Sequence, residues 1–488
     1  MTKPHSANRR GQWNDSLRTW VLASFVSIGL ASSEAWAEIA FGLATSFPSS
    51  GVVLDQCACD FDGDGDLDLV TVIEGADDLE IQYGFGPSAF FPMLALGPGP
   101  MGSIAAGDLD GNGTVEFVAA LSGADQLAIF SSASGSYQWT ATVPTASEPG
   151  RIALADFDQD GDLDIAVTLV GGLIPSGVQR FNNVSGVGFV SNGVSSVALN
   201  PMDLQAVDIT EDGKVDLVVS SRGMIGGTLG AITVLEGLGT GNFALPIPAA
   251  SGRFGDFEVA DLTGDGHLDV VAIAIDPSQC ANSMLLLSGA GGGMLLPGET
   301  VETPCGPVTL TVGDFDHDGT LDLLAADGGD LVPALNMIFA FRGLGNGAFQ
   351  GGDLVAAGDF GQRGWVVGDF DENGTRDLAF AGYFGGIDVL LSEQVFVPFL
   401  RGDANDDGVT DLSDAVFHLG VLFVPGSKDV ICEDAADVND DGQVDVSDPI
   451  YLLGSLFIPG SPPLPAPSTG CGIDPTDDPL ECDPVNCP

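Results

Sequence analysis

One acidic pattern recurs seven times along the chain, and it limits the fold more than any other feature. The pattern is D-x-D-x-D-G-x-x-D followed by an apolar residue, with small changes in some copies. Successive copies begin 48 to 55 residues apart, at Asp60, Asp108, Asp156, Asp208, Asp261, Asp314 and Asp369. Repeats of about 50 residues, with apolar stretches bounded by glycine-rich turns, are typical of four-stranded propeller blades. The repeat therefore predicts an all-β, seven-bladed β-propeller.

The ends of the repeat region fix the predicted number of blades. β-rich stretches follow the loops, for example at 67–73 and 268–275. The segment before Asp60 is too short for a blade but long enough for one outer strand. We expect residues 38–45 to pair into the last blade, which removes exposed sheet edges. The predicted propeller covers residues 38–400.

Each acidic loop has the composition of a calcium site. Ca²⁺ binds six to eight oxygen ligands, and oxygen-bearing side chains at positions 1, 3, 5 and 9 with the carbonyl of position 7 would surround one ion. Glycine at position 6 permits the tight turn. The predicted ligand residues are Asp60, Asp62, Asp64, Asp66, Asp68; Asp108, Asp110, Asn112, Thr114, Glu116; Asp156, Asp158, Asp160, Asp162, Asp164; Asp208, Thr210, Asp212, Lys214, Asp216; Asp261, Thr263, Asp265, His267, Asp269; Asp314, Asp316, Asp318, Thr320, Asp322; and Asp369, Asp371, Asn373, Thr375, Asp377.

These seven loops resemble the calcium loops of FG-GAP repeats, known from integrin α-subunit propellers, and of the related bacterial VCBS repeats. The resemblance covers residues 38–400 and implies about seven Ca²⁺ ions in the propeller. Thr210 and Thr263 replace the acid at position 3, so those two loops are expected to bind calcium more weakly.

A second duplicated pattern follows the propeller. Two loops of EF-hand type, 34 residues apart, each run into an apolar stretch with helical spacing and then stop at Pro-Gly. Pro449 is placed at the start of the second predicted helix, where proline is tolerated. The predicted ligands are Asp403, Asn405, Asp407, Val409 (carbonyl), Asp411 and Asp414, and Asp437, Asn439, Asp441, Gln443 (carbonyl), Asp445 and Asp448.

This duplicated loop and helix resembles a dockerin domain over residues 401–460. The resemblance implies a small α-helical module with two Ca²⁺ ions and a cohesin-like protein partner. A Pro- and Cys-rich tail at 461–488 departs from the dockerin pattern. The whole arrangement resembles secreted surface proteins of planctomycete-type bacteria.

The N-terminal segment predicts secretion. Basic residues within 3–18, an apolar run at 20–31 and a small-residue site ending at Ala37 are typical of a signal peptide, so we expect residues 1–37 to be removed and the protein to be extracellular or at the cell surface. The eight cysteines all follow this segment, which favours disulfides, although the pairing stays open and a bridge between Cys57 and Cys59 would be strained. The formal net charge of −55 argues against nucleic-acid partners, and no membrane span is expected downstream.

Catalytic residues are scarce in the sequence. Of four histidines, His5 lies in the leader, His267 and His317 lie in acidic loops, and His418 lies on a predicted helix. We therefore expect a binding or adhesion protein, with a protein or glycan ligand at a propeller face, rather than an enzyme. The alternatives are an accessory or catalytic part of polysaccharide breakdown and a structural coat protein. The long connections after residue 275 and around Gly328 are candidate ligand-binding loops.

Two further patterns have structural interpretations. Tyr137 and Trp139 alternate, so they are expected to face the same side of one strand and to pack within a blade. Arg401-Gly402-Asp403 spells an adhesion tripeptide, but Asp403 is also the first position of a calcium loop. We interpret the tripeptide as coincidental.

Overall fold

A computed structural model describes residues 39–468 except 40, 43, 75–77, 85–89, 122, 133–136, 171–175, 185–187, 225–226, 276–282, 302, 304–305, 317, 328–335, 359–363, 372, 374, 383–385, 393–399, 406, 425–429, 431, 441, 459 and 467. The predicted signal peptide, most of the tail after residue 461 and the connections at 276–282 and 328–335 thus lie outside the described residues. The chain divides into two compact units, with the division between residues 395 and 396.

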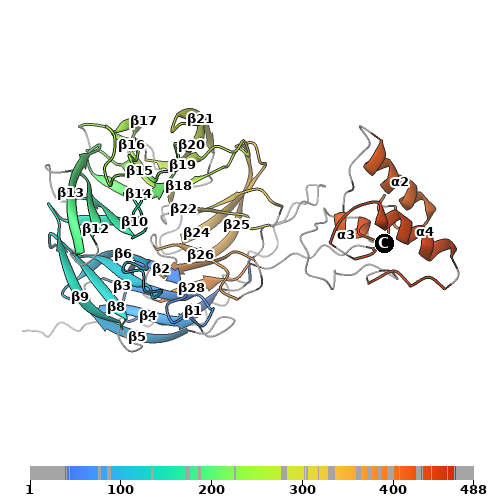
Figure 1. The fold of residues 1–488 in the computed structure, drawn as a ribbon, viewed down its shortest axis with the longest axis horizontal. Coiled ribbons are helices and arrows are strands. Elements are labelled where there is room, and N and C mark those ends of the chain that lie inside the picture. The colour runs from blue at the N-terminus through green and yellow to red at the C-terminus, as the bar shows by residue number, and fades with distance from the viewer. Residues whose placement is uncertain are drawn as a thin grey trace, which may run out of the picture. The chain divides into compact units, whose positions relative to one another are not determined.

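The first unit is a seven-bladed β-propeller, as the repeat predicts. Seven separate four-stranded antiparallel sheets surround a common centre (Figure 1). The first four blades are β2 (Val53–Cys59), β3 (Asp68–Ile73), β4 (Asp78–Gly84) and β5 (Phe90–Leu96); β6 (Met101–Gly107), β7 (Glu116–Leu121), β8 (Gln126–Ser132) and β9 (Tyr137–Pro144); β10 (Pro149–Ala155), β11 (Asp164–Leu169), β12 (Gly177–Val184) and β13 (Gly188–Ser196); and β14 (Pro201–Val207), β15 (Asp216–Ser221), β16 (Gly230–Leu235) and β17 (Ile247–Gly252). The last three are β18 (Phe254–Ala260), β19 (Asp269–Ala274), β20 (Ser283–Gly289) and β21 (Leu295–Val301); β22 (Pro307–Gly313), β23 (Asp322–Asp327), β24 (Asn336–Gly343) and β25 (Phe349–Gly358); and β26 (Val366–Gly368), β27 (Asp377–Ala381), β28 (Ile387–Leu390) and β1 (Thr45–Phe47).

The N-terminal segment closes the ring in the last blade, as expected, and the closing strand extends beyond the expected residues. β1 pairs antiparallel with β28, with Ser46 opposite Asp388. Within the expected segment 38–45, Phe41 adds one isolated bridge to Ser392. The closing strand therefore begins inside the expected segment, at Thr45, and ends two residues beyond it, at Phe47.

The acidic loops are the turns between the first and second strands of every blade. Position 9 of each loop is the first residue of the second strand, as with Asp68 at the start of β3. The residue after position 1 is apolar in every copy and is buried; Phe61, for example, packs edge-on against Phe117 of the next blade, with ring centroids 4.8 Å apart. Burying such a side chain contributes roughly 1.5–3 kcal/mol. The loop sequence thus also supplies the contact that holds neighbouring blades together.

The expectation for Tyr137 and Trp139 is wrong for the second residue. Tyr137 is buried and donates from its hydroxyl to the carbonyl of Val115 at 2.9 Å. Trp139 is 48 % exposed. Tyr137 and Trp139 pair in unbroken register with Ser132 and Phe130, and the register of β8 and β9 shifts only after Trp139. Trp139 is exposed because β9 is the outermost strand of its blade.

The second unit contains two related loop-helix pairs. Its helices are α2 (Leu412–Phe423), α3 (Glu433–Ala436) and α4 (Ser447–Phe457). α2 starts with a capping box, in which Asp411 accepts from the amide of Ser413 and Asp414 accepts from the amide of Asp411. Pro449 is the third residue of α4 rather than the first, a position that still needs no intrahelical amide donor. Among the described residues of the chain, no helix combines the length and the apolar character needed to cross a bilayer.

Arg401 ties the two halves of this unit together. Its side chain is fully buried and donates from Nη1 to the carbonyl of Asp437 at 2.6 Å and from Nε to the carbonyl of Ala466 at 3.1 Å. A buried guanidinium is not available to a receptor. This agrees with the interpretation of the Arg-Gly-Asp tripeptide as coincidental.

Candidate metal centres and the central channel

Five of the seven propeller loops gather three carboxylates each. The carboxylate oxygens of positions 1, 3 and 9 lie within 4.8 Å of one another in these loops. The groups are Asp60, Asp62 and Asp68; Asp108, Asp110 and Glu116; Asp156, Asp158 and Asp164; Asp314, Asp316 and Asp322; and Asp369, Asp371 and Asp377. Positions 1, 3 and 9 therefore converge in five loops, while the binding of an ion there stays a prediction.

The main chain of each loop wraps around the carboxylate at position 1. In the first loop, Asp60 accepts from the amides of Gly63 at 2.7 Å, Asp64 at 3.2 Å and Gly65 at 3.1 Å. Gly65, at position 6, has φ +105°, which other residues rarely adopt. These short-range contacts explain why the loop forms from its own sequence.

The carboxylate at position 9 also supports the fold. Asp68 is fully buried and accepts from the amide of Phe61 at 2.8 Å and from the amide of Gly84 at 2.6 Å. The first bond closes the loop, and the second joins it to the end of the third strand. The same pair of bonds recurs at Asp164, Asp269, Asp322 and Asp377. At Asp216 the loop donor is instead the amide of Thr210, at position 3, together with the amide of Gly237.

Position 5 contributes a hydrogen bond to the turn, and its predicted contact with an ion stays a prediction. Asp64 accepts from the amide of Asp66 at 3.0 Å, and Asp160 accepts from the amide of Asp162 at 3.0 Å. Position 5 belongs to none of the five carboxylate groups found among the described residues. Its side chain stabilises the turn beside the group, and the same bond forms at Asn112, Asp212, Asp265, Asp318 and Asn373.

The fourth, fifth and sixth loops carry a basic side chain against their acids. Lys214 contacts Asp212 within the fourth loop, and His267 of the fifth loop contacts Glu211 across blades at 2.5 Å. Arg342 reaches from β24 into the sixth loop, where its Nε lies 2.7 Å from Asp316 and its Nη2 lies 2.5 Å from Asp318. The fourth and fifth loops have threonine in place of the position-3 acid, and the hydroxyl oxygen of Thr263 is buried without a hydrogen-bond partner.

Burial raises the pKa of the position-9 carboxyls. The pKa of Asp68, Asp164 and Asp377 rises to about 6 and that of Asp322 to about 7, chiefly because burial disfavours the charged form. Neighbouring acids of the same loop add to the shift. A bound cation would remove this penalty.

The two C-terminal loops repeat one arrangement of bonds. Asp403 accepts from the amide of Gly408 at 2.7 Å, as Asp437 does from Gly442 at 2.8 Å. At position 12, the pKa of Asp414 is raised to about 6 and that of Asp448 to about 7, first because they are buried. Asp411 and Asp445, at position 9, bind the amides of Ser413 and Ser447 and thereby face the helix start. Asp441 lies outside the described residues, and neither loop forms a group of three carboxylates among those described.

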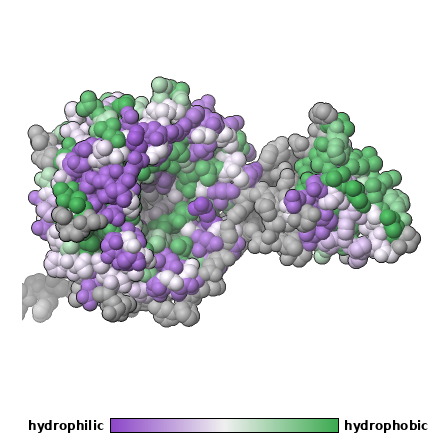
Figure 2. All heavy atoms as spheres, in the orientation of Figure 1, coloured by the Kyte–Doolittle hydropathy of each residue, from purple (hydrophilic) through white to green (hydrophobic). Residues whose placement is uncertain are grey.

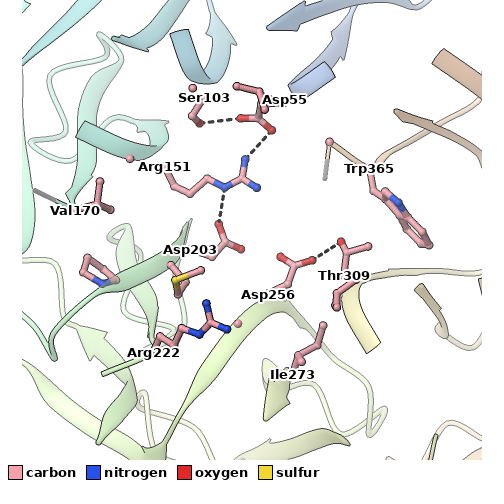
Figure 3. Close-up of a pocket in the computed structure, with 18 of the residues that line it drawn as sticks. Asp55, Ser103, Arg151, Val170, Asp203, Arg222, Asp256, Ile273, Thr309 and Trp365 are labelled. Carbon is pink, nitrogen blue, oxygen red and sulfur yellow. Dashed lines mark hydrogen bonds and ion pairs between the residues drawn. The ribbon is translucent and has the colours of Figure 1, made fainter. Parts of the chain in front are cut away.

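The structure adds a site that the loop motifs do not reveal. A cavity of about 640 Å³ occupies the centre of the propeller, and Figure 2 shows the hollow bordered by hydrophilic residues. Charged and polar side chains of the innermost strands line it, including Asp55, Arg151, Asp203 and Asp256 (Figure 3). The sequence does contain a signal for this cavity, because each blade contributes one lining residue that lies five positions before the acidic loop of that blade.

Comparison with known proteins agrees with this architecture. A model of the FG-GAP-like repeat matches residues 60–119, 108–167 and 208–272. The chain is thus a seven-bladed β-propeller that contains FG-GAP-like repeats over the matched residues. No protein with a curated description matches it in sequence.

Two solved structures are similar at a low level. A protein from Lactobacillus plantarum is 13 % identical with a TM-score of 0.44, covering 63 % of this chain and 85 % of its own. A protein of Bacteroides uniformis provisionally named a 6-phosphogluconolactonase is also 13 % identical with a TM-score of 0.44, covering 62 % and 87 %. At these values neither likeness bears on the activity of this chain.

Proposed function

We propose that the chain is a secreted or cell-surface calcium-binding propeller that acts as a binding or adhesion protein. The observation that carries the proposal is the convergence of positions 1, 3 and 9 into an all-oxygen donor set in five loops. Hard oxygen donors suit Ca²⁺, and thiolate or imidazole donors do not enter these groups. Asp158 Oδ1 is buried in the third group without a hydrogen-bond partner, which fits an oxygen kept for an ion.

Calcium would have a structural role in this proposal. Positions 1, 3 and 9 would hold the ion, while position 9 keeps its two bonds to the main chain. The bound ion would offset the repulsion among three carboxylates, and this matters in a chain of net charge −55. The described histidines support binding rather than catalysis, since His267 pairs with Glu211 and His418 is buried in α2.

The second unit is proposed as a dockerin-like attachment module. α2 and α4 expose large apolar side chains at matched positions 34 residues apart, which appear as hydrophobic surface in Figure 2. The matched pairs are Leu412 with Val446, Val416 with Ile450, Phe423 with Phe457 and Val424 with Ile458, each at least 44 % exposed. Such exposed apolar groups favour a protein partner, of the cohesin kind that the resemblance implies.

Thermal unfolding of the purified full chain with calcium, and again with excess EDTA, tests the calcium proposal. Ligands that bind only the folded state raise its stability, so EDTA is expected to lower the Tm sharply and added calcium to restore it. An unchanged Tm would refute the proposal. Adhesion assays and a polysaccharide panel separate the two functions: hydrolysis of any polysaccharide would favour the alternative role in polysaccharide breakdown.

A further inference from the structure

One residue from each blade faces the central channel at the same level. Each lies five positions before the acidic loop of its blade, and together they are Asp55, Ser103, Arg151, Asp203, Asp256, Thr309 and Gly364. We call these seven residues the channel ring. Six of the seven carry polar side chains, whereas neighbouring levels of the same strands are mostly apolar. The repeat therefore builds a polar ring whose composition differs from blade to blade.

Hydrogen bonds inside the ring satisfy only part of its charge. Asp55 accepts from Ser103 Oγ at 2.8 Å and from the amide of Ile104 at 3.1 Å, and it pairs with Arg151 Nη1 at 2.6 Å. Asp55 is thus neutralised within the protein. Arg151 reaches Asp203 only at 3.8 Å, through Nε (Figure 3).

Asp203 and Asp256 leave an excess of negative charge on the other side of the ring. Asp256 accepts from Thr309 Oγ1 at 2.6 Å and from the amide of Leu310 at 3.1 Å, which are neutral donors. Burial and the neighbouring charge of Asp256 raise the pKa of Asp203 well above its usual range. Glu258, two residues after Asp256, adds a third carboxylate and accepts from Gln205 at 2.8 Å. Two arginines, Arg151 and Arg222, line the cavity, and they are outnumbered by its five carboxylates: Asp55, Glu148, Asp203, Asp256 and Glu258.

One polar group without a partner lines this cavity, and another contacts a residue that lines it. Trp365 lines the cavity, and its indole Nε1 is buried without a hydrogen-bond partner. Gln56 is 6 % exposed, and neither atom of its amide has a partner; its side chain lies against the channel residue Gly364. Unsatisfied buried polar groups are costly, and they are most easily explained where a ligand completes them.

We propose that the channel ring binds an organic cation, an ammonium or guanidinium group, held mainly by Asp203 and Asp256. The volume of about 640 Å³ falls in the range of small-molecule pockets, roughly 300–1,000 Å³, and is larger than a bare ion needs. Calcium needs six to eight oxygens, and the donors already placed on Asp55 and Asp256 leave too few. This inference deepens the proposed binding function by naming the chemistry of the ligand.

Calorimetric titration of the full chain, with calcium at saturation, tests the proposal. The probes are spermidine, the blocked peptides acetyl-Gly-Arg-Gly-amide and acetyl-Gly-Lys-Gly-amide, and the neutral peptide with citrulline in place of arginine. We expect at least one cation to bind and the citrulline peptide not to bind. Binding of spermidine alone would indicate a free amine, and binding of a basic peptide alone would indicate a protein side chain. No binding by any of the three cations, or equal binding of the citrulline peptide, overturns the proposal.

Variants locate the site. Asp203→Asn with Asp256→Asn should weaken cation binding by about tenfold or more, since two charge-assisted contacts are lost. Glu299→Gln with Asp353→Asn makes the same change of charge on the exposed outer strands β21 and β25 and should leave the Kd unchanged. Wild-type affinity in the channel variant, or equal weakening in the control, overturns the proposal.

A gain of affinity provides an independent check. Arg151→Gln removes the internal competitor for Asp203, so the cation should bind several times more tightly, a result that a purely structural role would not produce. The shift of Tm by EDTA is measured on each variant. It should match the wild type, which shows that the propeller is folded and separates failure of the channel site from failure of the calcium proposal.

Discussion

Arg401 donates from Nη1 to the carbonyl oxygen of Asp437 at 2.6 Å, and this bond joins the beginning of the first C-terminal loop to the beginning of the second. The same guanidinium reaches Asp440 at 2.9 Å. A chain of this composition has few bases, so a fully buried arginine with these partners has a structural role.

Replacing Arg401 should destabilise the C-terminal unit. Arg401→Met leaves the carbonyl of Asp437 and the carboxylate of Asp440 without this donor, and we expect a loss of about 3 kcal/mol. Hydrogen exchange of the amides in α2 and α4 measures it locally. Arg376→Met, at an exposed arginine of the propeller, is the matched control and should leave that exchange unchanged. Protection of α2 and α4 that survives Arg401→Met would contradict the role given to this side chain.

Positions 3 and 9 of one loop should respond differently to the same substitution. Both carboxylate oxygens of Asp68 accept from main-chain amides, so Asp68→Asn places an NH₂ group against one of these donors. The free energy of unfolding should therefore fall by about 2 kcal/mol even in EDTA. Asp62→Asn keeps an oxygen for the amide of Asp64, 3.2 Å away, and should reduce only the stabilisation by calcium. Denaturant unfolding with and without EDTA distinguishes them. Equal losses in EDTA would show that position 9 has no separate structural role.

The metal-free protein should become less stable as pH rises. The pKa of Asp68, Asp164 and Asp377 is about 6 and that of Asp322 about 7 in the folded state, against an ordinary value of 3.8. Between about pH 4 and 7 the folded state therefore holds more protons than the unfolded state, and its stability falls as pH rises through the folded pKa values. In EDTA, the Tm should be higher at pH 5 than at pH 8. Saturating calcium favours the ionised form of these carboxyls, so it should reduce or reverse the difference in Tm. A Tm in EDTA that rises from pH 5 to pH 8 would contradict the raised pKa of the position-9 carboxyls.

Arg342 should compete with calcium in the sixth loop. Its guanidinium pairs with Asp316 and Asp318, so Arg342→Gln removes a positive charge from the place where an ion would bind. We expect equilibrium dialysis at limiting free calcium to show about one more bound ion per chain than the wild type. Arg376→Gln, again an exposed site, controls for the change in net charge. An unchanged count in Arg342→Gln would mean that the arginine and the ion do not share the site.

The sequence was sufficient to predict the number of blades and the place of each acidic loop. Both depend on contacts between residues close in sequence, such as the amides of Gly63 and Gly65 on Asp60, and a pattern of nine residues contains them all. The start of the second strand at position 9 follows for the same reason. Aspartate and glycine at these positions favour a turn through short-range hydrogen bonds and positive φ angles, so seven copies of the pattern predict seven turns.

The tertiary structure decided which loop positions converge and what surrounds them. Arg342 enters the sixth loop from a strand 24 residues away from Asp318, and Trp139 is exposed because its strand β9 is the outermost of its blade. The channel ring joins residues from seven blades, and Asp203 and Asp256 meet only when the fourth and fifth blades pack against each other. Such contacts depend on the packing of whole blades against one another, and no local pattern specifies which side chains that packing brings together.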